Sequence, residues 1–226
     1  MLRIVAVGLV SISGAAGISA CGSPRAAGSA HPSTAPSAPP ATIAGGAEAG
    51  LRAAASSMVR ASSFSFVATL RVGGKLTTLA GRFQAPDRED ITVRAAGSAP
   101  AEVLFVGTRS WVREPGGAWG SMLGSAGGAT DPRSTFSVLD GAAGVSATEP
   151  AGGEVVYSFT LPASAAIQLL HLSTGATGTL AGTVVAKGGI VTGLDLRSAP
   201  GNRSVSEQIA YSNVGSAAPV PLPPGA

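Results

Sequence analysis

The chain has 226 residues, a formal net charge of +3 and only 12% charged residues, and its Lys and Arg residues are scattered. The absence of a basic run argues against binding to nucleic acid. One cysteine excludes an internal disulfide, and the residues that follow it suffice for one domain with one core.

Residues 1–20 have the composition of a secretory signal peptide. Arg3 precedes an uncharged apolar segment that ends in small residues before Cys21. This order predicts export, with cleavage between Ala20 and Cys21. One alternative is a membrane-spanning helix with a chance cysteine, although the segment is at the short end of the spanning range of roughly 17–25 residues. The other is a plain secretory signal with a free cysteine.

The chain after Cys21 changes to Pro, Ser, Ala and Gly. Such a composition cannot bury enough apolar surface to fold, so residues 21–46 are expected to form a disordered tether that begins at Cys21. His31 within it is expected to be solvated. Residues 217–226 form a second, Pro-rich irregular tail, which leaves residues 47–216 as the domain.

The domain opens with a predicted helix and a predicted hairpin. Apolar residues at helical spacing predict a helix over residues 47–62. Residues 63–72 and 75–83 then alternate, and Gly73-Gly74 between them is a strong hairpin signal. If Val72 pairs with Lys75, Phe64 opposes Phe83 and the apolar residues of both strands share one face.

Further alternating segments predict more strands, at residues 90–94, 102–114, 118–122, 154–161, 179–187, 190–197 and 204–212. Pairing Lys187 with Ile190 places one apolar face at residues Ala181, Val185, Ile190, Leu194 and Leu196. Short helices are predicted after Asp131 and over residues 163–172. The expected fold class is α+β, an antiparallel sheet with helices on its apolar face.

A pair of tryptophans and a cluster of charged residues each allow more than one interpretation. Trp111 and Trp119 lie on the two arms of one predicted hairpin, either as a platform for a sugar or, as we favour, as a packing pair across the strands. Acidic residues around Arg88, in the sequence Asp87-Arg88-Glu89-Asp90, favour a solvated loop over a cation site.

The sequence Ile18-Ser19-Ala20-Cys21 resembles a bacterial lipobox, with Ile18 in place of the usual Leu, and implies diacylglycerol and palmitate attachment at Cys21. The order of lipobox, tether, helix, hairpin, the segment 106–112, Trp119 and late strand pair is similar to the actinobacterial LppX/LprAFG lipoproteins, which share the LolA-like half-barrel. This resemblance implies a strongly curved antiparallel sheet with helices packed on its concave apolar face and a cavity between them. It also implies binding and transport of lipid in the cell envelope.

The aromatic residues of two strand pairs collect on one face, with small residues between them, which predicts an apolar cavity there. The expected lining residues are Phe64, Phe66, Ala68, Leu70, Leu79, Phe83, Val155, Tyr157, Phe159 and Leu161. We expect no catalytic residue, metal or cofactor, because His171 is the only histidine of the domain and no nucleophile motif is present.

The expected protein is therefore a monomeric lipoprotein that is anchored by Cys21 to the outer face of the cell membrane. In the first hypothesis it binds acylated lipid or glycolipid and carries it through the envelope, with an envelope transporter as a further candidate partner. In the alternative it is a surface-exposed structural or interaction lipoprotein without a stable ligand. An envelope enzyme is the third and least favoured class.

Overall fold

The computed structural model describes residues 41–43, 46–122, 131–150, 152–162, 165, 178–198 and 205–223. These residues belong to one compact unit. The predicted signal peptide at residues 1–20, Cys21 and His31 lie outside the described residues. So does the predicted helix over residues 163–172, apart from residue 165, and with it His171.

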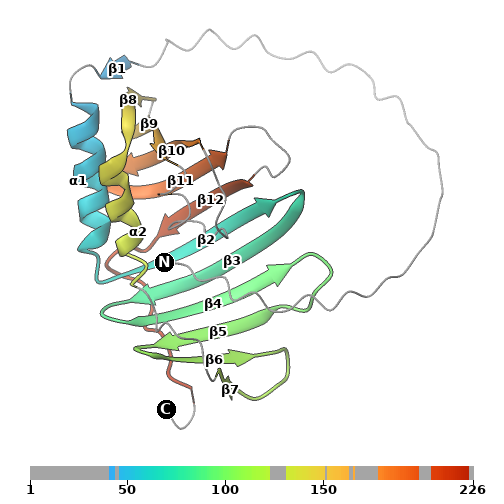
Figure 1. Cartoon of the computed structure of the whole chain (residues 1–226). Helices are drawn as coiled ribbons and strands as arrows, with labels where there is room; N and C mark the ends of the chain where they lie inside the picture. The colour runs from blue at the N-terminus through green and yellow to red at the C-terminus, as the bar shows by residue number, and fades with distance from the viewer. Residues whose placement is uncertain are drawn as a thin grey trace, which may run out of the picture. The chain divides into compact units, whose positions relative to one another are not determined.

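Within the described residues, twelve strands form a single antiparallel sheet (Figure 1). Its order is β1-β8-β9-β10-β11-β12-β2-β3-β4-β5-β6-β7, and the sheet is open because the two edge strands, β1 and β7, do not pair with each other. The strands are β1 Ala41–Ile43, β2 Ser63–Val72, β3 Lys75–Gln84, β4 Arg88–Ala95, β5 Ala101–Val106, β6 Arg109–Arg113, β7 Gly120–Ser121, β8 Ala143–Glu149, β9 Glu154–Pro162, β10 Thr179–Lys187, β11 Ile190–Ser198 and β12 Val205–Ser212.

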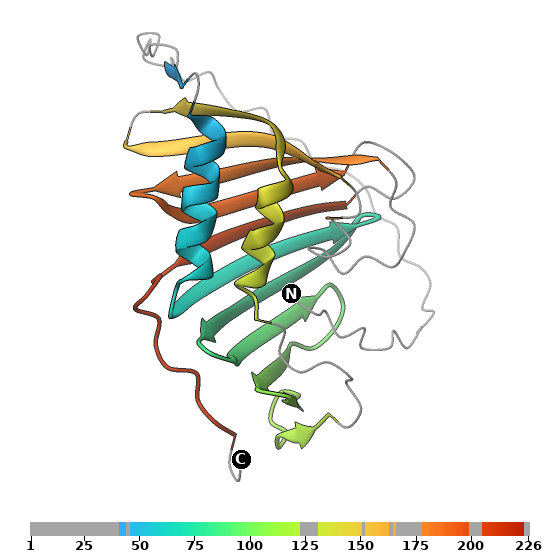
Figure 2. The same ribbon diagram turned by 60° about the vertical axis from the view of Figure 1, so that its left-hand side comes forward.

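Two helices cover one face of this sheet (Figure 2). Helix α1, Ala47–Val59, contacts β8 and β11 and packs beside α2, Ser134–Ser137, which continues into the 3-10 turn η1, Val138–Gly141. The buried side of α1 carries Leu51, Ala54, Ala55 and Met58, which is the helical spacing expected from the sequence. The predicted fold class, an α+β half-barrel with helices on its apolar face, is confirmed.

The β2–β3 hairpin has the register predicted from the sequence. Val72 pairs with Lys75 and Phe64 pairs with Phe83. Gly73 and Gly74 form the turn with φ values of 55° and 82°, a conformation that other residues adopt only at a cost. Phe64 and Phe83 are consequently both buried on the face that the helices cover.

The β10–β11 hairpin has the predicted turn, and of its predicted apolar face Leu194 and Leu196 are buried. Lys187 pairs with Ile190, as expected, yet the register shifts between Val185 and Ala186. This β-bulge leaves Thr192 as an extra residue without a partner position on β10. Val191 and Leu194, three residues apart, are consequently buried on the same face. The buried residues are Leu180, Val184, Ala186, Val191, Leu194 and Leu196, whereas Ala181 and Ile190 are exposed.

Other boundaries also differ from the sequence-based expectation. The predicted strand at residues 102–114 is two strands, β5 and β6, because Gly107, with a φ of 58°, allows a tight turn before Arg109. Strand β8 was not predicted, since its small and polar residues show little alternation. Strand β1 lies within the predicted tether and pairs with β8, so the sheet begins before residue 46.

Residues 217–223 of the C-terminal tail have no regular secondary structure and pack against the sheet. The backbone N–H of Ala217 donates to Ser63 Oγ over 3.2 Å, and that of Val220 donates to Gln84 Oε1 over 3.0 Å. Val220 is buried. The sequence did not predict this contact, because Pro-rich composition carries no information about a docking surface.

Candidate lipid pocket

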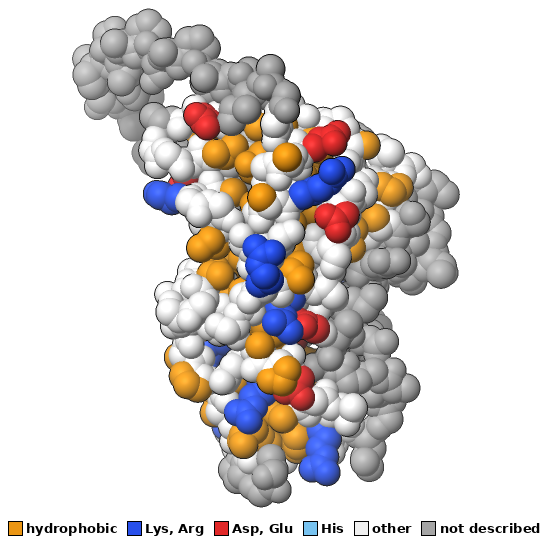
Figure 3. All heavy atoms as spheres, turned by 90° about the vertical axis from the view of Figure 1, so that its left-hand side faces the viewer, with side chains coloured by type: hydrophobic (Ala, Val, Ile, Leu, Met, Phe, Trp, Pro, Cys, Tyr) orange, Lys and Arg blue, Asp and Glu red, His pale blue; other side chains and the backbone are white. Residues whose placement is uncertain are grey.

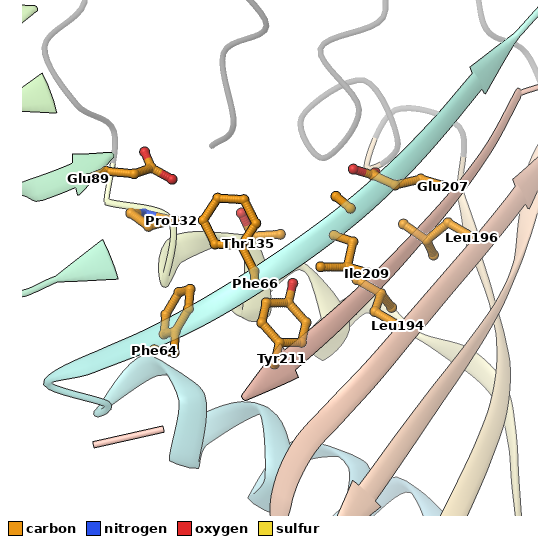
Figure 4. Close-up of a pocket in the computed structure, with 11 residues that line it drawn as sticks. Phe64, Phe66, Glu89, Pro132, Thr135, Leu194, Leu196, Glu207, Ile209 and Tyr211 are labelled. Atoms are coloured by element: carbon orange, nitrogen blue, oxygen red, sulfur yellow. The ribbon is translucent and has the colours of Figure 1, made fainter. Parts of the chain in front are cut away.

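An apolar pocket lies between the sheet and α2 (Figure 4). Its walls come from three adjacent strands, β11, β12 and β2, together with β4 and the chain at the start of α2. The lining residues are Phe64, Phe66, Ala68, Glu89, Pro132, Thr135, Leu194, Leu196, Glu207, Ile209 and Tyr211. Alternation along each strand explains the set, because residues two apart share a face.

An aromatic cluster forms one end of the pocket. The Phe64 ring lies 5.1 Å from that of Phe83 and 5.7 Å from that of Tyr211, measured between centroids. Phe136 of α2 reaches the same ring from the helix side, at 6.4 Å and with the two ring planes perpendicular. Edge-to-face contacts of this kind stabilise an aromatic cluster beyond the area they bury, so this end of the pocket is firmly packed.

An ion pair lies at the same end of the pocket. Arg133 Nε donates to Asp131 Oδ1 over 2.8 Å, and the Arg133 guanidinium lies 5.2 Å from the centroid of the Phe83 ring. Arg133 Nη1 also donates to the carbonyl oxygen of Ala61 over 3.4 Å. These contacts hold the start of α2 against the end of α1 and the sheet, and they position Pro132 at the pocket.

Three of the ten lining residues expected from the sequence line this pocket, namely Phe64, Phe66 and Ala68. Leu70, Leu79, Phe83, Tyr157, Phe159 and Leu161 are buried elsewhere in the core, and Val155 is partly exposed. Strand β9 carries Val155, Tyr157, Phe159 and Leu161, and it is separated from β2 by β10, β11 and β12. This order explains why the β9 residues do not reach the pocket with those of β2.

Two carboxyl groups project into the largely apolar pocket, whose other polar lining residues are Thr135 and Tyr211, and the sequence pattern did not select either carboxyl group. Glu89 is 2% exposed and Glu207 is 5% exposed. Figure 4 shows them at opposite sides of the pocket, with the carboxyl groups turned toward it. Burial raises the pKa of Glu89 to about 8 and that of Glu207 to about 7.

Alternation places both carboxylates on the apolar face of their strands. Glu207 lies at an even spacing from Val205, Ile209 and Tyr211, and Glu89 has the same relation to Ile91. The expectation of a solvated loop at residues 87–90 is wrong, because β4 begins at Arg88 and places successive side chains on opposite faces. Asp90 consequently pairs with Arg82, whose Nε donates to Asp90 Oδ2 over 3.1 Å, while Glu89 points inward.

The cavity within this pocket has a volume of about 40 Å³. That space suffices for a few water molecules, since each needs roughly 10–15 Å³ by the same measure. Pockets that enclose drug-sized ligands typically measure about 300–1,000 Å³. The pocket is therefore closed to an acyl chain in this conformation.

A larger groove, of about 620 Å³, lies on the face of the sheet that the helices leave uncovered. Its walls include Val67, Arg82, Arg113 and Trp119, together with Leu222 of the C-terminal tail. The predicted packing pair of tryptophans is wrong, since Trp111 pairs with Ser121 across the strands. Trp119 instead lies under the Arg113 guanidinium, 4.6 Å from the ring centroid, and Arg113 also pairs with Glu102.

The described part of the chain contains no group of three or more His, Cys, Asp or Glu side chains that could hold a metal ion. Nor does it contain a helix of the length and hydrophobicity needed to cross a membrane. On the side of the molecule where α1 lies in Figure 1, basic, acidic and hydrophobic side chains are interspersed (Figure 3). This surface shows no extended area of a single charge.

An open antiparallel sheet with helices on one face defines a half-barrel fold. The chain has the fold of LppX, a lipoprotein of Mycobacterium tuberculosis, with a TM-score of 0.54, 15% identity and coverage of 77% of this chain and 97% of that one. LprF of Mycobacterium bovis matches with a TM-score of 0.54, 15% identity and coverage of 79% and 97%. No protein-family model matches the sequence, and no curated protein sequence matches it either.

Proposed function

We propose that this protein is a cell-envelope lipoprotein that binds acylated lipid or glycolipid between its sheet and helices and carries it through the envelope. The observation that supports this function most directly is the pocket, in which aromatic and aliphatic side chains of β2, β11 and β12 face α2. Acyl chains that enter it would bury apolar area at roughly 25 cal/mol per Å². The shared fold with the lipoprotein LppX supports the same proposal.

The size of the cavity defines what this function requires. At about 40 Å³ the pocket must widen before an acyl chain enters. The same small volume favours the second candidate, an interaction lipoprotein with a filled core and no stable ligand, because a packed core leaves few voids larger than a water molecule. The two functions differ in whether the pocket opens.

Ala68→Trp separates these two candidates. Ala68 is fully buried at the pocket. If the pocket opens for acyl chains, it also accommodates the indole, so we expect lipid bound during expression to be lost while the melting temperature stays close to that of the wild type. Native mass spectrometry and thermal unfolding measure the two quantities on the full chain with Cys21→Ala.

Ala80→Trp is the matched control, because Ala80 is exposed on the other face of the neighbouring strand. This variant should retain the bound lipid. A wild-type protein without lipid, combined with a destabilisation of about 1–3 kcal/mol or more by Ala68→Trp, would identify a filled core. That result would favour the interaction lipoprotein.

The anchor belongs to the same proposal. Cys21 would carry the lipid and become the first residue after cleavage, holding the domain at the outer face of the cell membrane. One acyl chain gives only marginal membrane binding, whereas two chains hold a protein stably, as diacylglycerol does.

Cys21→Ala should release the protein from the membrane fraction. Membrane and aqueous fractions are compared by immunoblot after a high-salt wash, which removes electrostatically bound protein. Ser23→Ala, two residues after Cys21, should leave the protein in the membrane fraction. Retention of the Cys21→Ala variant in the washed membranes would argue against lipid attachment at this residue.

A further inference from the structure

We propose that the carboxyl group of Glu89 is the polar recognition group of the pocket, and that it binds the carbonyl oxygen of an acyl ester on the lipid. This inference rests on the proposed lipid-binding function. It adds the chemical class of the ligand, an ester-linked lipid, and the side chain that distinguishes it.

The first observation is a buried oxygen atom without a partner. Glu89 Oε1 has no hydrogen-bond partner among the described residues and lies in a side chain that is 2% exposed. An unsatisfied polar atom of this kind costs about 1–3 kcal/mol of stability. A leucine at this position would avoid the cost, so the carboxyl group is better explained by a ligand than by the fold.

The second observation is the position of Glu89. It lies in the wall of the apolar pocket, and Figure 4 shows its carboxyl group turned toward the Phe66 ring and Pro132 rather than away from the pocket. A ligand that occupies the space between these side chains brings its own polar atom to Oε1 or Oε2. The remaining surfaces of the pocket offer it mainly carbon.

The chemistry of the carboxyl group selects the ligand atom. Burial is the largest cause that raises the pKa of Glu89 to about 8, so that Glu89 is protonated at neutral pH. Two negative groups also oppose its ionisation: Asp90 of the same strand, which pairs with Arg82, and Asp131 before α2, which pairs with Arg133. A protonated carboxyl group donates one hydrogen bond, and it therefore requires an acceptor.

An acyl ester supplies that acceptor next to a long apolar chain. Its carbonyl oxygen accepts a hydrogen bond and carries no charge, so it enters an apolar pocket at a lower desolvation cost than a phosphate or carboxylate. An ether-linked chain of the same length lacks this oxygen. The pocket should consequently prefer the ester.

Glu207 provides an internal control. Glu207 of β12 pairs with Leu70 of β2. Glu89 of β4 pairs with Phe83 of β3, which in turn pairs with Phe64 of β2, six residues before Leu70. At about 3.3 Å per residue, this places the backbone positions of the two residues roughly 20 Å apart along the strand direction. The two groups therefore cannot contact the same ester, and the loss of Glu207 should not remove a preference that Glu89 creates.

The test compares 1,2-dipalmitoylglycerol with its dihexadecyl ether analogue. Both are presented in the same detergent to the full chain with Cys21→Ala, and bound lipid is measured by native mass spectrometry. We expect about five-fold tighter binding of the ester, the size of effect that one hydrogen bond typically produces. Glu89→Leu should bind both lipids equally and bind the ether at least as tightly as the wild type does.

Two further variants complete the test. Glu89→Gln keeps a neutral hydrogen-bond donor and should keep the ester preference, and Glu207→Leu should keep it too. In the wild type the preference should disappear as pH rises past about 8, where Glu89 loses its proton, while in Glu89→Gln it should persist.

The possible results distinguish the recognition group from the lipid site. An ester preference that survives in Glu89→Leu, or equal binding of ester and ether by the wild type, overturns the role of Glu89 and leaves lipid binding intact. Binding of neither lipid by the wild type overturns the proposed function itself.

Discussion

Phe64→Ala should lower the free energy of unfolding by about 3–5 kcal/mol, the range typical for removing a buried phenylalanine ring. Phe64 is 1% exposed, and its ring lies within 6.4 Å of those of Phe66, Phe83, Phe136 and Tyr211, measured between centroids. The substitution therefore removes the centre of the cluster that joins the sheet to α2. A single domain typically has about 5–15 kcal/mol of stability, so much of it would be lost.

Urea unfolding followed by circular dichroism measures this effect through the transition midpoint, provided that the slope stays constant. Val67→Ala is the control, because Val67 is on the same strand but 51% exposed on the opposite face. Its effect should stay within about 0.5 kcal/mol. Similar losses for the two variants would show that the two faces of β2 do not differ in burial, in conflict with the structure.

Raising the pH from 5 to about 8.5 should destabilise the domain by several kcal/mol. Burial raises the pKa of Glu89 from 4.5 to about 8, and it also raises that of Glu207 to about 7. Between pH 4.5 and these values the folded state binds more protons than the unfolded state does. The free energy of unfolding consequently falls as pH rises through this window and levels off above it.

Glu89 alone should account for a loss on the order of 4 kcal/mol, from the difference between its folded and unfolded pKa. Chemical unfolding at half-unit intervals of pH measures the slope. Glu89→Leu should flatten the slope and raise stability most at pH 8.5, because the variant has no buried group to ionise.

Glu48→Gln controls for a general effect of removing a carboxyl group. Glu48 is exposed on α1 and pairs only across one turn with Arg52. This variant should show the same dependence on pH as the wild type. If the wild type itself were equally stable at pH 5 and 8.5, the carboxyl groups of the pocket would not be buried in the way described.

Local patterns in the sequence predicted those features that local chemistry controls. The β2–β3 hairpin could be paired residue by residue, because Gly73 and Gly74 specify the turn and the side-chain period of two then determines which residues share a face. The stripe on α1 was predictable for the same kind of reason. These elements were sufficient to indicate an α+β sheet with one apolar face, which the structure confirms.

Features that depend on distant contacts could not be predicted in this way. The bulge between Val185 and Ala186 places Ala186 and Val191 on the buried face in place of Val185 and Ile190, whereas Leu194 and Leu196 are buried as expected. The strand order separates β9 from β2 by three strands, so the expected lining residues of β9 do not reach the pocket that Phe64, Phe66 and Ala68 line. Neither the bulge nor the strand order has a signal in a short segment.

The amino-acid sequence by itself determined the first helix, most of the strands, the main hairpin register and the division of the sheet into an apolar and a polar face. Tertiary structure alone decided which apolar residues border empty space, and it placed Glu89 and Glu207 among them. The physical reason is that pattern reports which side of a strand a residue faces, whereas burial depends on what packs against that side. A carboxylate in an alternating strand is therefore exposed or buried according to neighbours that lie far away in the chain.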